Sequence, residues 1–271
     1  MLIDAHSHLD RYEEALELAL DEINKHKILT ISTSMDIPSF ERNLEIGERC
    51  DLVLPAFGIH PWNAPDNKDR LEELHDAIDR SPIIGEIGLD HHFIEDTSQY
   101  AAQYKVFDFF LSAAKEQNKI VNLHTKGAER EILERLINYG IQHAIIHWYS
   151  GPLEVFYELL EYGVYFTIGV ELLFSDHIKE LVRQLPLERL LTETDNPGGY
   201  RWLTGEIGMP SIIKSVIKSL AEVKNSTTEI IIQNVLENFF QLIKTNAHLT
   251  EIGNNILRFK KSDHNDNFAR L

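Results

Sequence analysis

The stretch P-I-I-G-E-I-G-L-D, residues 82–90, together with the helical pattern that follows it at residues 99–117, decides the fold. The apolar run predicts a β-strand, and the longer pattern predicts an α-helix. The next apolar run, K-I-V-N-L-H at residues 119–124, predicts another strand, and a second helical pattern follows it. Strands that alternate with helices indicate βαβ units and a parallel sheet.

The same alternation extends through most of the chain in both directions. Eight strand–helix units in about 225 residues fit a (β/α)8 TIM barrel, which typically has about 250 residues. We therefore expect an α/β fold, with a doubly wound open sheet as the alternative; no glycine-rich phosphate fingerprint follows the first strand, which weakens that alternative. The expected strands are 3–6, 27–33, 52–61, 82–90, 119–124, 143–147, 164–170 and 189–195, and the expected helices are 13–25, 36–50, 68–80, 99–117, 128–139, 152–162, 175–184 and 210–224.

The chain is expected to form a single domain over residues 1–244, followed by a C-terminal extension or tail at residues 245–271. One more helix, at residues 226–244, is expected to pack outside the barrel. Residues 253–271 are polar and mixed in charge, which is typical of a loosely ordered tail.

Composition limits the partners. The net charge is −17, from 43 acidic against 26 basic residues, which argues against a passive, electrostatically bound nucleic acid or membrane. It leaves room for an enzyme that meets a phosphate at bound cations, because metal ions reverse the local field. The single cysteine, Cys50, excludes an intramolecular disulfide and a cysteine-based zinc site. With no signal-peptide pattern at the N-terminus and only short apolar runs, a reduced, cytoplasmic location without a membrane span is expected.

Histidines and acids gather at the ends of the predicted strands. In a barrel, catalytic residues come from the carboxyl ends of several strands at once. The pair His6 and His8 in D-A-H-S-H would be weak evidence alone, because 13 histidines produce such a pair by chance about half the time. The combination is far less expected by chance; its members are His6 and His8, His60, Glu86 with Asp90, His124, His147 and Asp195.

Imidazole and carboxylate ligands suit Zn²⁺, Mn²⁺ or Mg²⁺. The set exceeds the three protein ligands of a usual single catalytic zinc, so we expect two divalent ions with a shared carboxylate. Glu86, in the middle of the strand order, is the candidate bridge. Asp195 is the candidate both for a ligand and for the base that takes the proton of the attacking water.

The motifs D-A-H-S-H-L-D, G-I-H-P, G-E-I-G-L-D, L-H-T, I-H-W-Y-S-G and L-L-T-E-T-D-N-P resemble, in order, those of the TatD-type metal-dependent hydrolases, a family of the amidohydrolase superfamily of (β/α)8 barrels. The resemblance runs from Ile3 to about Lys244. It implies that His6 and His8 bind one ion, that Glu86 bridges, that His124 and His147 bind the second ion, and that Asp195 also binds the first ion and acts as base. It also implies a magnesium- or zinc-dependent DNase, often with 3′–5′ exonuclease activity.

Three residues around this set have candidate roles of their own. His60 matches a rim histidine that touches substrate or a further ion; its alternative role is to cap the loop after the third strand. Asp90 either supports the site or begins a loop, and Glu193 shares the face of Asp195 and is a candidate support.

The chain departs from the family pattern in two places. Trp148-Tyr149 replaces the usual Cys-Phe, and N-P-G-G-Y-R-W-L-T-G-E-I-G-M-P replaces the usual Ser-Pro-Tyr segment and its basic loop. Arg201 is the one base in that loop and is the candidate to hold a phosphate. Trp148 and Trp202 are candidates to stack on a base or sugar; the alternative is a surface arginine and two packing aromatics.

Three functions follow as hypotheses. The first is a metal-dependent phosphodiesterase that acts on DNA. The second keeps the metal ions and hydrolyses an amide, ester or lactone instead, because the same hydroxide attacks a carbonyl carbon. The third is a non-catalytic scaffold subunit, against which the complete ligand set argues.

Overall fold

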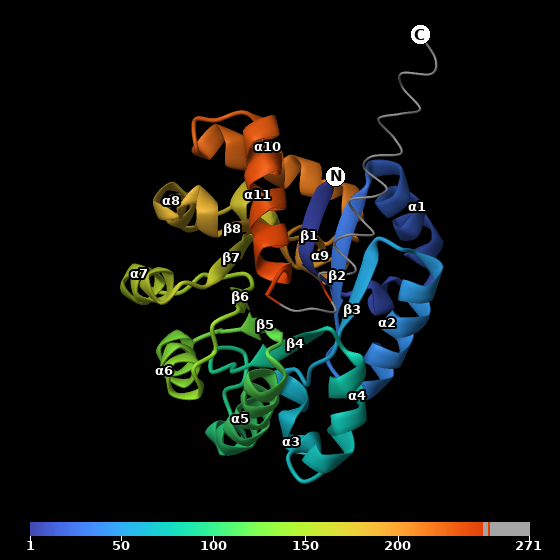
Figure 1. The fold of residues 1–271 in the computed structure, drawn as a ribbon. Helices are drawn as coiled ribbons and strands as arrows, with labels where there is room; N and C mark the ends of the chain where they lie inside the picture. The colour runs from blue at the N-terminus through green and yellow to red at the C-terminus, as the bar shows by residue number, and fades with distance from the viewer. Residues whose placement is uncertain (246–248, 250–271) are drawn as a thin grey trace.

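The computed structural model describes residues 1–245 and residue 249, so the expected extension at 245–271 lies almost wholly outside the described residues. Within them the chain forms a barrel of eight parallel strands surrounded by helices (Figure 1). This confirms the expected α/β barrel, and the alternative of an open sheet is wrong.

Two hydrogen-bonded groups of strands make the barrel, β1-β2-β3 and β4-β5-β6-β7-β8. At one junction Phe57 bridges to Ile84, and Gly85 N donates to Phe57 O at 2.8 Å. At the other, Asp195 N donates to His6 O at 2.9 Å, so the chain leaving the last strand lies against the first. The strands are β1 Leu2–Ser7, β2 Ile28–Thr33, β3 Val53–Ala56, β4 Ile83–Gly88, β5 Ile120–His124, β6 Ala144–Ile146, β7 Tyr165–Ile168 and β8 Leu190–Thr192.

The helices are amphipathic segments that cover the outside of the strands. Local signals set their ends. Asp36 caps the second helix by accepting from Ser39 N at 2.9 Å, with Pro38 in the first turn as expected. The helices are α1 Leu16–His26, α2 Ile37–Arg49, α3 Ala64–Asn67, α4 His75–Arg80, α5 Tyr100–Gln117, α6 Glu129–Tyr139, α7 Leu153–Tyr162, α8 Asp176–Gln184, α9 Gly198–Thr204, α10 Ile213–Val223 and α11 Thr228–Ile243. None of the described helices combines the length and apolar character that spanning a bilayer requires.

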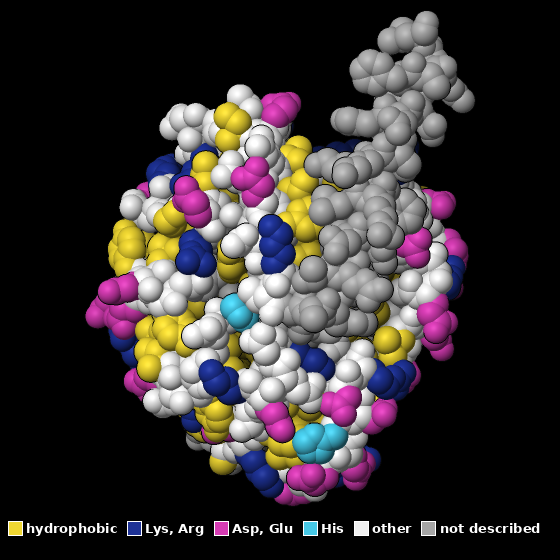
Figure 2. Space-filling model, viewed as in Figure 1, with side chains coloured by type: hydrophobic (Ala, Val, Ile, Leu, Met, Phe, Trp, Pro, Cys, Tyr) yellow, Lys and Arg dark blue, Asp and Glu magenta, His cyan; other side chains and the backbone are white. Residues whose placement is uncertain are grey.

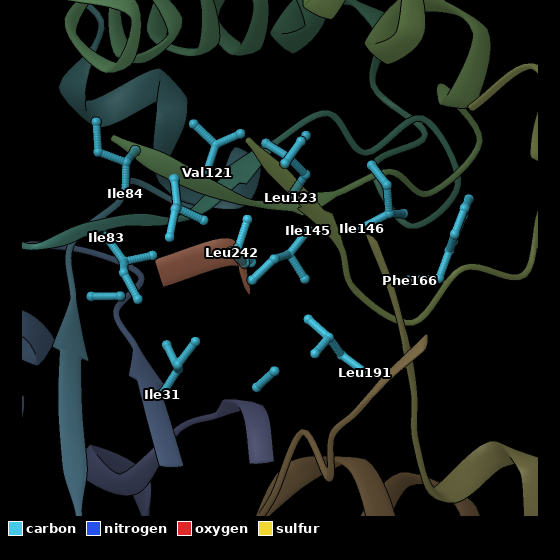
Figure 3. Packing of buried hydrophobic residues seen from close by; sticks show 14 of the residues in the cluster. Ile31, Ile83, Ile84, Val121, Leu123, Ile145, Ile146, Phe166, Leu191 and Leu242 are labelled. Atoms are coloured by element: carbon cyan, nitrogen blue, oxygen red, sulfur yellow. The ribbon is translucent and has the colours of Figure 1, made fainter. Parts of the chain in front are cut away.

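The core occupies the inside of the barrel and the layer beneath the helices. Every residue of β2, β4 and β5 is buried, as expected for parallel strands covered on both faces. Figure 3 shows side chains from these strands and from β8 gathered around Leu242 of α11. Asn238 of the same helix donates to Leu190 O, at the start of β8, at 2.8 Å. Helix α11 therefore closes the amino end of the barrel and leaves the carboxyl end for a site.

The face drawn in Figure 2, which carries α11, bears interspersed acidic and basic side chains. Among the described residues of that face they form no large basic patch.

Several sequence predictions of elements were wrong in detail. The strands expected at 52–61 and 189–195 end earlier, at Ala56 and Thr192. The helix expected at 68–80 is a 3₁₀ turn at Leu71–Leu74 followed by α4, because the charged segment 68–70 offers no apolar side chain to pack and Arg70 is non-helical. The helix expected from residue 13 begins at Leu16, after Glu13 takes a φ of 48°. The loop expected after β8 contains the short helix α9.

Candidate metal centre

All six residues predicted as metal ligands, and His60, lie at the carboxyl end of the barrel. Glu86 lies in β4, His6 in β1 and His124 at the last position of β5. The other four follow strand ends directly or within a few residues; they are His8 after β1, His60 after β3, His147 after β6 and Asp195 after β8. The barrel topology thus brings together side chains from six strands, spread over 190 positions of the sequence.

The Glu86 carboxylate is the centre of this cluster, and its residue is only 2 % exposed. Ring nitrogens of five histidines lie within 3.5 Å of its two oxygens. The distances are 2.9 Å to His124 Nδ1, 3.0 Å to His147 Nε2, 3.3 Å to His8 Nε2, 3.4 Å to His60 Nε2 and 3.5 Å to His6 Nε2. A buried carboxylate surrounded by imidazoles on every side is suited to share its oxygens between cations.

Three of the rings are oriented from behind by a hydrogen-bond acceptor. His6 Nδ1 lies 2.9 Å from Asn122 Oδ1, and His8 Nδ1 lies 3.1 Å from the Thr33 carbonyl oxygen. His124 Nε2 lies 3.0 Å from Asp90 Oδ2. In the neutral ring, each acceptor holds the proton on the outer nitrogen and leaves the lone pair of the inner nitrogen facing the cluster. This is the arrangement that metal-binding histidines need.

His147 is supported by Glu193. The His147 Nδ1 atom lies 3.4 Å from Glu193 Oε2, while Glu193 accepts from Trp148 N at 2.9 Å and from the Thr167 hydroxyl at 2.6 Å. These two donors fix the carboxylate behind the ring. The geometry agrees with the support expected of Glu193.

His60 turns its protonated nitrogen toward the cluster, unlike the three histidines that have an acceptor behind the ring. Its Nδ1 accepts from Trp62 N at 3.2 Å, so a neutral ring carries its proton on Nε2, the atom that faces Glu86 and His124. Burial lowers the pKa of His60 to about 4, which keeps the ring neutral. In this arrangement His60 is a hydrogen-bond donor toward the cluster, whereas the inner nitrogens of His6, His8 and His124 would offer their lone pairs to a bound cation.

The charges of the cluster depend on one another. Burial alone would lower the pKa of His8, but hydrogen bonds to Asp195 and Glu86 outweigh it and raise the pKa to about 9. Burial likewise opposes the charged form of His147, but the charge of Glu86 and the carboxylate of Glu193 raise its pKa to about 10. Burial also disfavours the Glu86 anion, yet the surrounding histidines hold its pKa well below the usual range. Because metal ligands must be unprotonated, a bound cation would displace the imidazole protons and take their place as counter-charge.

Asp195 stands at the rim of the cluster, with Oδ1 3.3 Å from His8 Nε2 and 3.7 Å from His6 Nε2. Its backbone has a φ of 51°, in the left-handed region, which turns the side chain into the barrel mouth. The preceding residue is fixed by Asp4, which accepts from Thr194 N at 2.9 Å and from the Thr194 hydroxyl at 2.7 Å. Asp195 is thus a carboxylate in a fixed position beside two of the histidines.

The donor atoms fit divalent ions. Three groups have ligand atoms within 4.8 Å of one another: His6, Glu86 and His147; His6, His8 and Asp195; and His60, Glu86 and His124. Glu86 belongs to two of the groups, as expected of a bridging carboxylate. The prediction that His124 and His147 share one ion differs from this grouping, in which His147 joins His6 and His124 joins His60.

A pocket of about 370 Å³ opens beside the cluster and includes His147 and Asp195 in its wall. Lys126 also lines it, with Nζ donating to Trp148 O at 2.7 Å and to Ser150 Oγ at 2.8 Å. Burial lowers the pKa of this amine. The sequence analysis missed Lys126, which stands two residues beyond His124 in L-H-T-K; its place just past a strand end was the available signal.

Arg201 does not line the pocket. Residues 198, 199, 202 and 203 of α9 form the lining face, and a helix turns 100° per residue, so Arg201 points away from it. Its residue is exposed. Trp148 and Trp202, by contrast, both line the pocket, with Trp202 72 % exposed.

A (β/α)8 barrel with a buried histidine–carboxylate cluster at its carboxyl end defines a class, the metal-dependent hydrolases. The chain belongs to one family of that class: the family model for TatD related DNase matches residues 3–244. It is a TatD family metal-dependent hydrolase.

Relatives agree over nearly the whole chain. An uncharacterised metal-dependent hydrolase of Bacillus subtilis, YabD, is 32% identical over 261 residues, which is 91% of this chain and 100% of that protein. The human deoxyribonuclease TATDN3 is 28% identical over 269 residues, 92% of this chain and 97% of that one. Among solved structures, the TatD homologue YjjV of Escherichia coli aligns with a TM-score of 0.81 and 25% identity over 89% of this chain and 97% of that chain.

Proposed function

We propose that this protein is a deoxyribonuclease that hydrolyses phosphodiester bonds with a water activated at two divalent ions. The observation that carries the proposal is the single carboxylate of Glu86 within 3.5 Å of ring nitrogens from five histidines on four strands. His6, His8, Glu86, His124, His147 and Asp195 would hold Zn²⁺, Mg²⁺ or Mn²⁺. Such ions, when bound, neutralise a phosphate and generate hydroxide from water near neutral pH.

The protein's own groups divide the remaining work. Asp195, at the rim and next to the pocket, is the base that takes the proton of the attacking water. Glu86 holds its negative charge between the two ligand groups and keeps their positions fixed. His60 presents its Nε2–H toward the same carboxylate and is the candidate hydrogen-bond donor to a substrate oxygen.

Lys126 is the positively charged side chain best placed to bind the substrate phosphate. Its amine is in the pocket wall that contains His147 and Asp195, whereas the side chain predicted for this role, Arg201, lies on the other face of α9. The Lys126 ammonium group, positioned by two hydrogen bonds, supplies positive charge where the acidic chain otherwise repels DNA. DNA is therefore the proposed substrate, met at the bound cations and Lys126.

The test is hydrolysis of single-stranded DNA labelled at the 3′ or the 5′ end, with purified protein supplied with Mg²⁺, Mn²⁺ or Zn²⁺. We expect cleavage that is lost in His124→Ala and kept in His75→Ala, a matched change at an exposed histidine on α4. Unequal loss of the two labels reports the polarity of an exonuclease.

Intact DNA with every ion, together with turnover of small amides, esters or lactones, would replace the proposal by the carbonyl hydrolase. No bound ion by elemental analysis, with normal folding, would favour the non-catalytic scaffold. The three hypotheses thus give different results in one set of assays.

A further inference from the structure

Three aromatic side chains stand at the mouth of the pocket, and we call them the aromatic rim: Trp62, Phe93 and Trp202. They are 45 %, 44 % and 72 % exposed. Their rings form a chain of edge-to-face contacts, with centroids 6.2 Å apart between Trp62 and Phe93 and 5.8 Å apart between Phe93 and Trp202. The three residues follow three different strands, β3, β4 and β8. Scattered exposed apolar residues need no explanation, but a contiguous group beside a buried ionic cluster indicates a binding surface.

Two of the three rim residues are fixed by the protein itself. Trp62 Nε1 donates to Asp90 Oδ2 at 2.7 Å, and Phe93 N donates to Asp90 Oδ1 at 2.7 Å. Asp90 is buried, so these bonds are protected from water. The Trp62 ring and the backbone of Phe93 are therefore held in place without a ligand, which reduces the ordering needed when one binds.

The aromatic rim lies next to residues of the histidine–carboxylate cluster. All three rim residues line the same pocket as Trp148, His147 and Asp195. The pocket volume, about 370 Å³, lies at the small end of the range for ligand sites, about 300–1,000 Å³. It accepts one flat group next to the reacting phosphate and is too small for a base pair with its stacked neighbours.

We propose that the aromatic rim is a subsite for one nucleobase of the substrate, adjacent to the phosphodiester that is cleaved. This rests on the proposed nuclease function. Flat aromatic rings next to a lysine match a nucleotide, whose base stacks and whose phosphate pairs with the amine. Stacking is tolerant of sequence because every base has a π-face, so the subsite binds any of the four bases. Trp202, the most exposed member, is the residue expected to contact the base face.

The experiment compares two chromogenic phosphodiesters, thymidine 5′-(p-nitrophenyl phosphate) and methyl p-nitrophenyl phosphate, with the metal-loaded protein. They share the leaving group and differ in the nucleoside. We expect a kcat/KM ratio of about tenfold or more in favour of the nucleoside ester, arising mainly in KM. In the double variant Phe93→Ala with Trp202→Ala we expect the two kcat/KM values to agree within about twofold. The single variant Trp202→Phe keeps a ring at this position and should retain most of the wild-type ratio.

The matched control is Tyr157→Ala, an exposed aromatic on α7, which should keep the full ratio. A wild-type ratio near one, or a ratio that survives the double variant, overturns the subsite.

Equilibrium binding separates this inference from the proposed function. Calorimetry with the metal-loaded protein compares thymidine 5′-monophosphate with 2-deoxyribose 5-phosphate, which lacks the base. This measurement needs no turnover. We expect about tenfold tighter binding of the nucleotide, lost in the double variant. If neither phosphodiester is hydrolysed, the nuclease proposal fails, and the binding comparison still decides whether the rim recognises a base. Equal affinity for the two phosphates overturns the inference.

Discussion

The metal cluster and the aromatic rim lie side by side but are built differently. The cluster side chains come from strands or positions at their ends and are nearly all buried, with His6 fully buried and Glu86 only 2 % exposed. The rim side chains come from loops and the short helix α9, and each is more than two-fifths exposed. Under the proposed function, the strands position the reacting groups, and the loops present the surface that a substrate meets.

This difference explains why the class of enzyme is easier to establish than its substrate. The cluster repeats residue types that any member of such a barrel family needs for holding cations. Of the rim residues, Trp202 lies in the segment 196–210, which departs from the family pattern. Changes in the cluster should therefore affect every substrate, whereas changes in the rim should affect the choice among substrates.

The largest expected effect is from metal removal. Exhaustive chelation should reduce hydrolysis to background and lower the melting temperature by about 5–10 °C, because ions that bind only the folded state add about 2.7 kcal/mol at 100 times their Kd and each kcal/mol shifts Tm by about 2–4 °C. Calorimetry with and without chelator, followed by reloading, measures this. A melting temperature indifferent to chelator would show that the cluster does not hold stabilising ions.

Asp195→Asn should come next. It keeps the size of the side chain but removes the proposed base, so we expect kcat to fall by about 10²–10⁴-fold. Elemental analysis of the variant distinguishes loss of the base from loss of an ion. Asp176→Asn, at an exposed aspartate on α8, is the matched control. Near-normal kcat in the Asp195 variant would mean that another group takes the proton.

Asp90 contacts both regions, so Asp90→Asn should reduce kcat/KM by an intermediate factor. Asp90 Oδ2 accepts from Trp62 Nε1 and from His124 Nε2, while Oδ1 accepts from the backbone N–H groups of His92 and Phe93. In asparagine one of these two oxygens becomes an NH2 group, which cannot accept, so one pair of donors loses its partner. A loss of about 10–100-fold is expected, as for other residues that orient a metal-binding histidine. Steady-state kinetics with the nucleoside and methyl esters should show lower rates for both and a smaller ratio between them. An unchanged ratio would separate the rim from the cluster.

The smallest effect is a control on the scaffold. Thr227 caps α11 at the amino end of the barrel, where its hydroxyl accepts from Ile230 N at 3.3 Å. Thr227→Ala should cost about 1 kcal/mol of unfolding free energy and about 2–4 °C in Tm. Thermal denaturation measures the loss of stability, and kcat/KM of the variant should equal that of the wild type. A change in kcat/KM would contradict the separation of the two ends of the barrel.

The sequence predicted the fold and the composition of the cluster because both follow from short periodicities. Alternating apolar runs and helical patterns gave eight βα units, and parallel strands in a barrel place all carboxyl ends at one mouth. His6 and His8 needed only the two-residue repeat of a strand, and His124 only its place at a strand end.

The parts that the sequence did not predict depend on contacts between distant loops. Asn122 and the Thr33 carbonyl, which orient His6 and His8, have no local signature. The segment N-P-G-G predicted a loop, yet α9 begins there. A Cβ at Gly199 would lie 2.6 Å from Thr194 O and 2.8 Å from the Trp148 ring, so this glycine lets the helix approach the end of β8.

Asp90 has one consequence for engineering. One of its oxygens receives both the indole N–H of Trp62 and the ring N–H of His124. A loop transplanted from a relative to alter substrate choice would have to bring its own donor to that oxygen, or the basicity of the histidine would change with the graft. Specificity and reactivity in this barrel are therefore not independent modules, and loop exchange at residues 61–63 calls for compensation at residue 90.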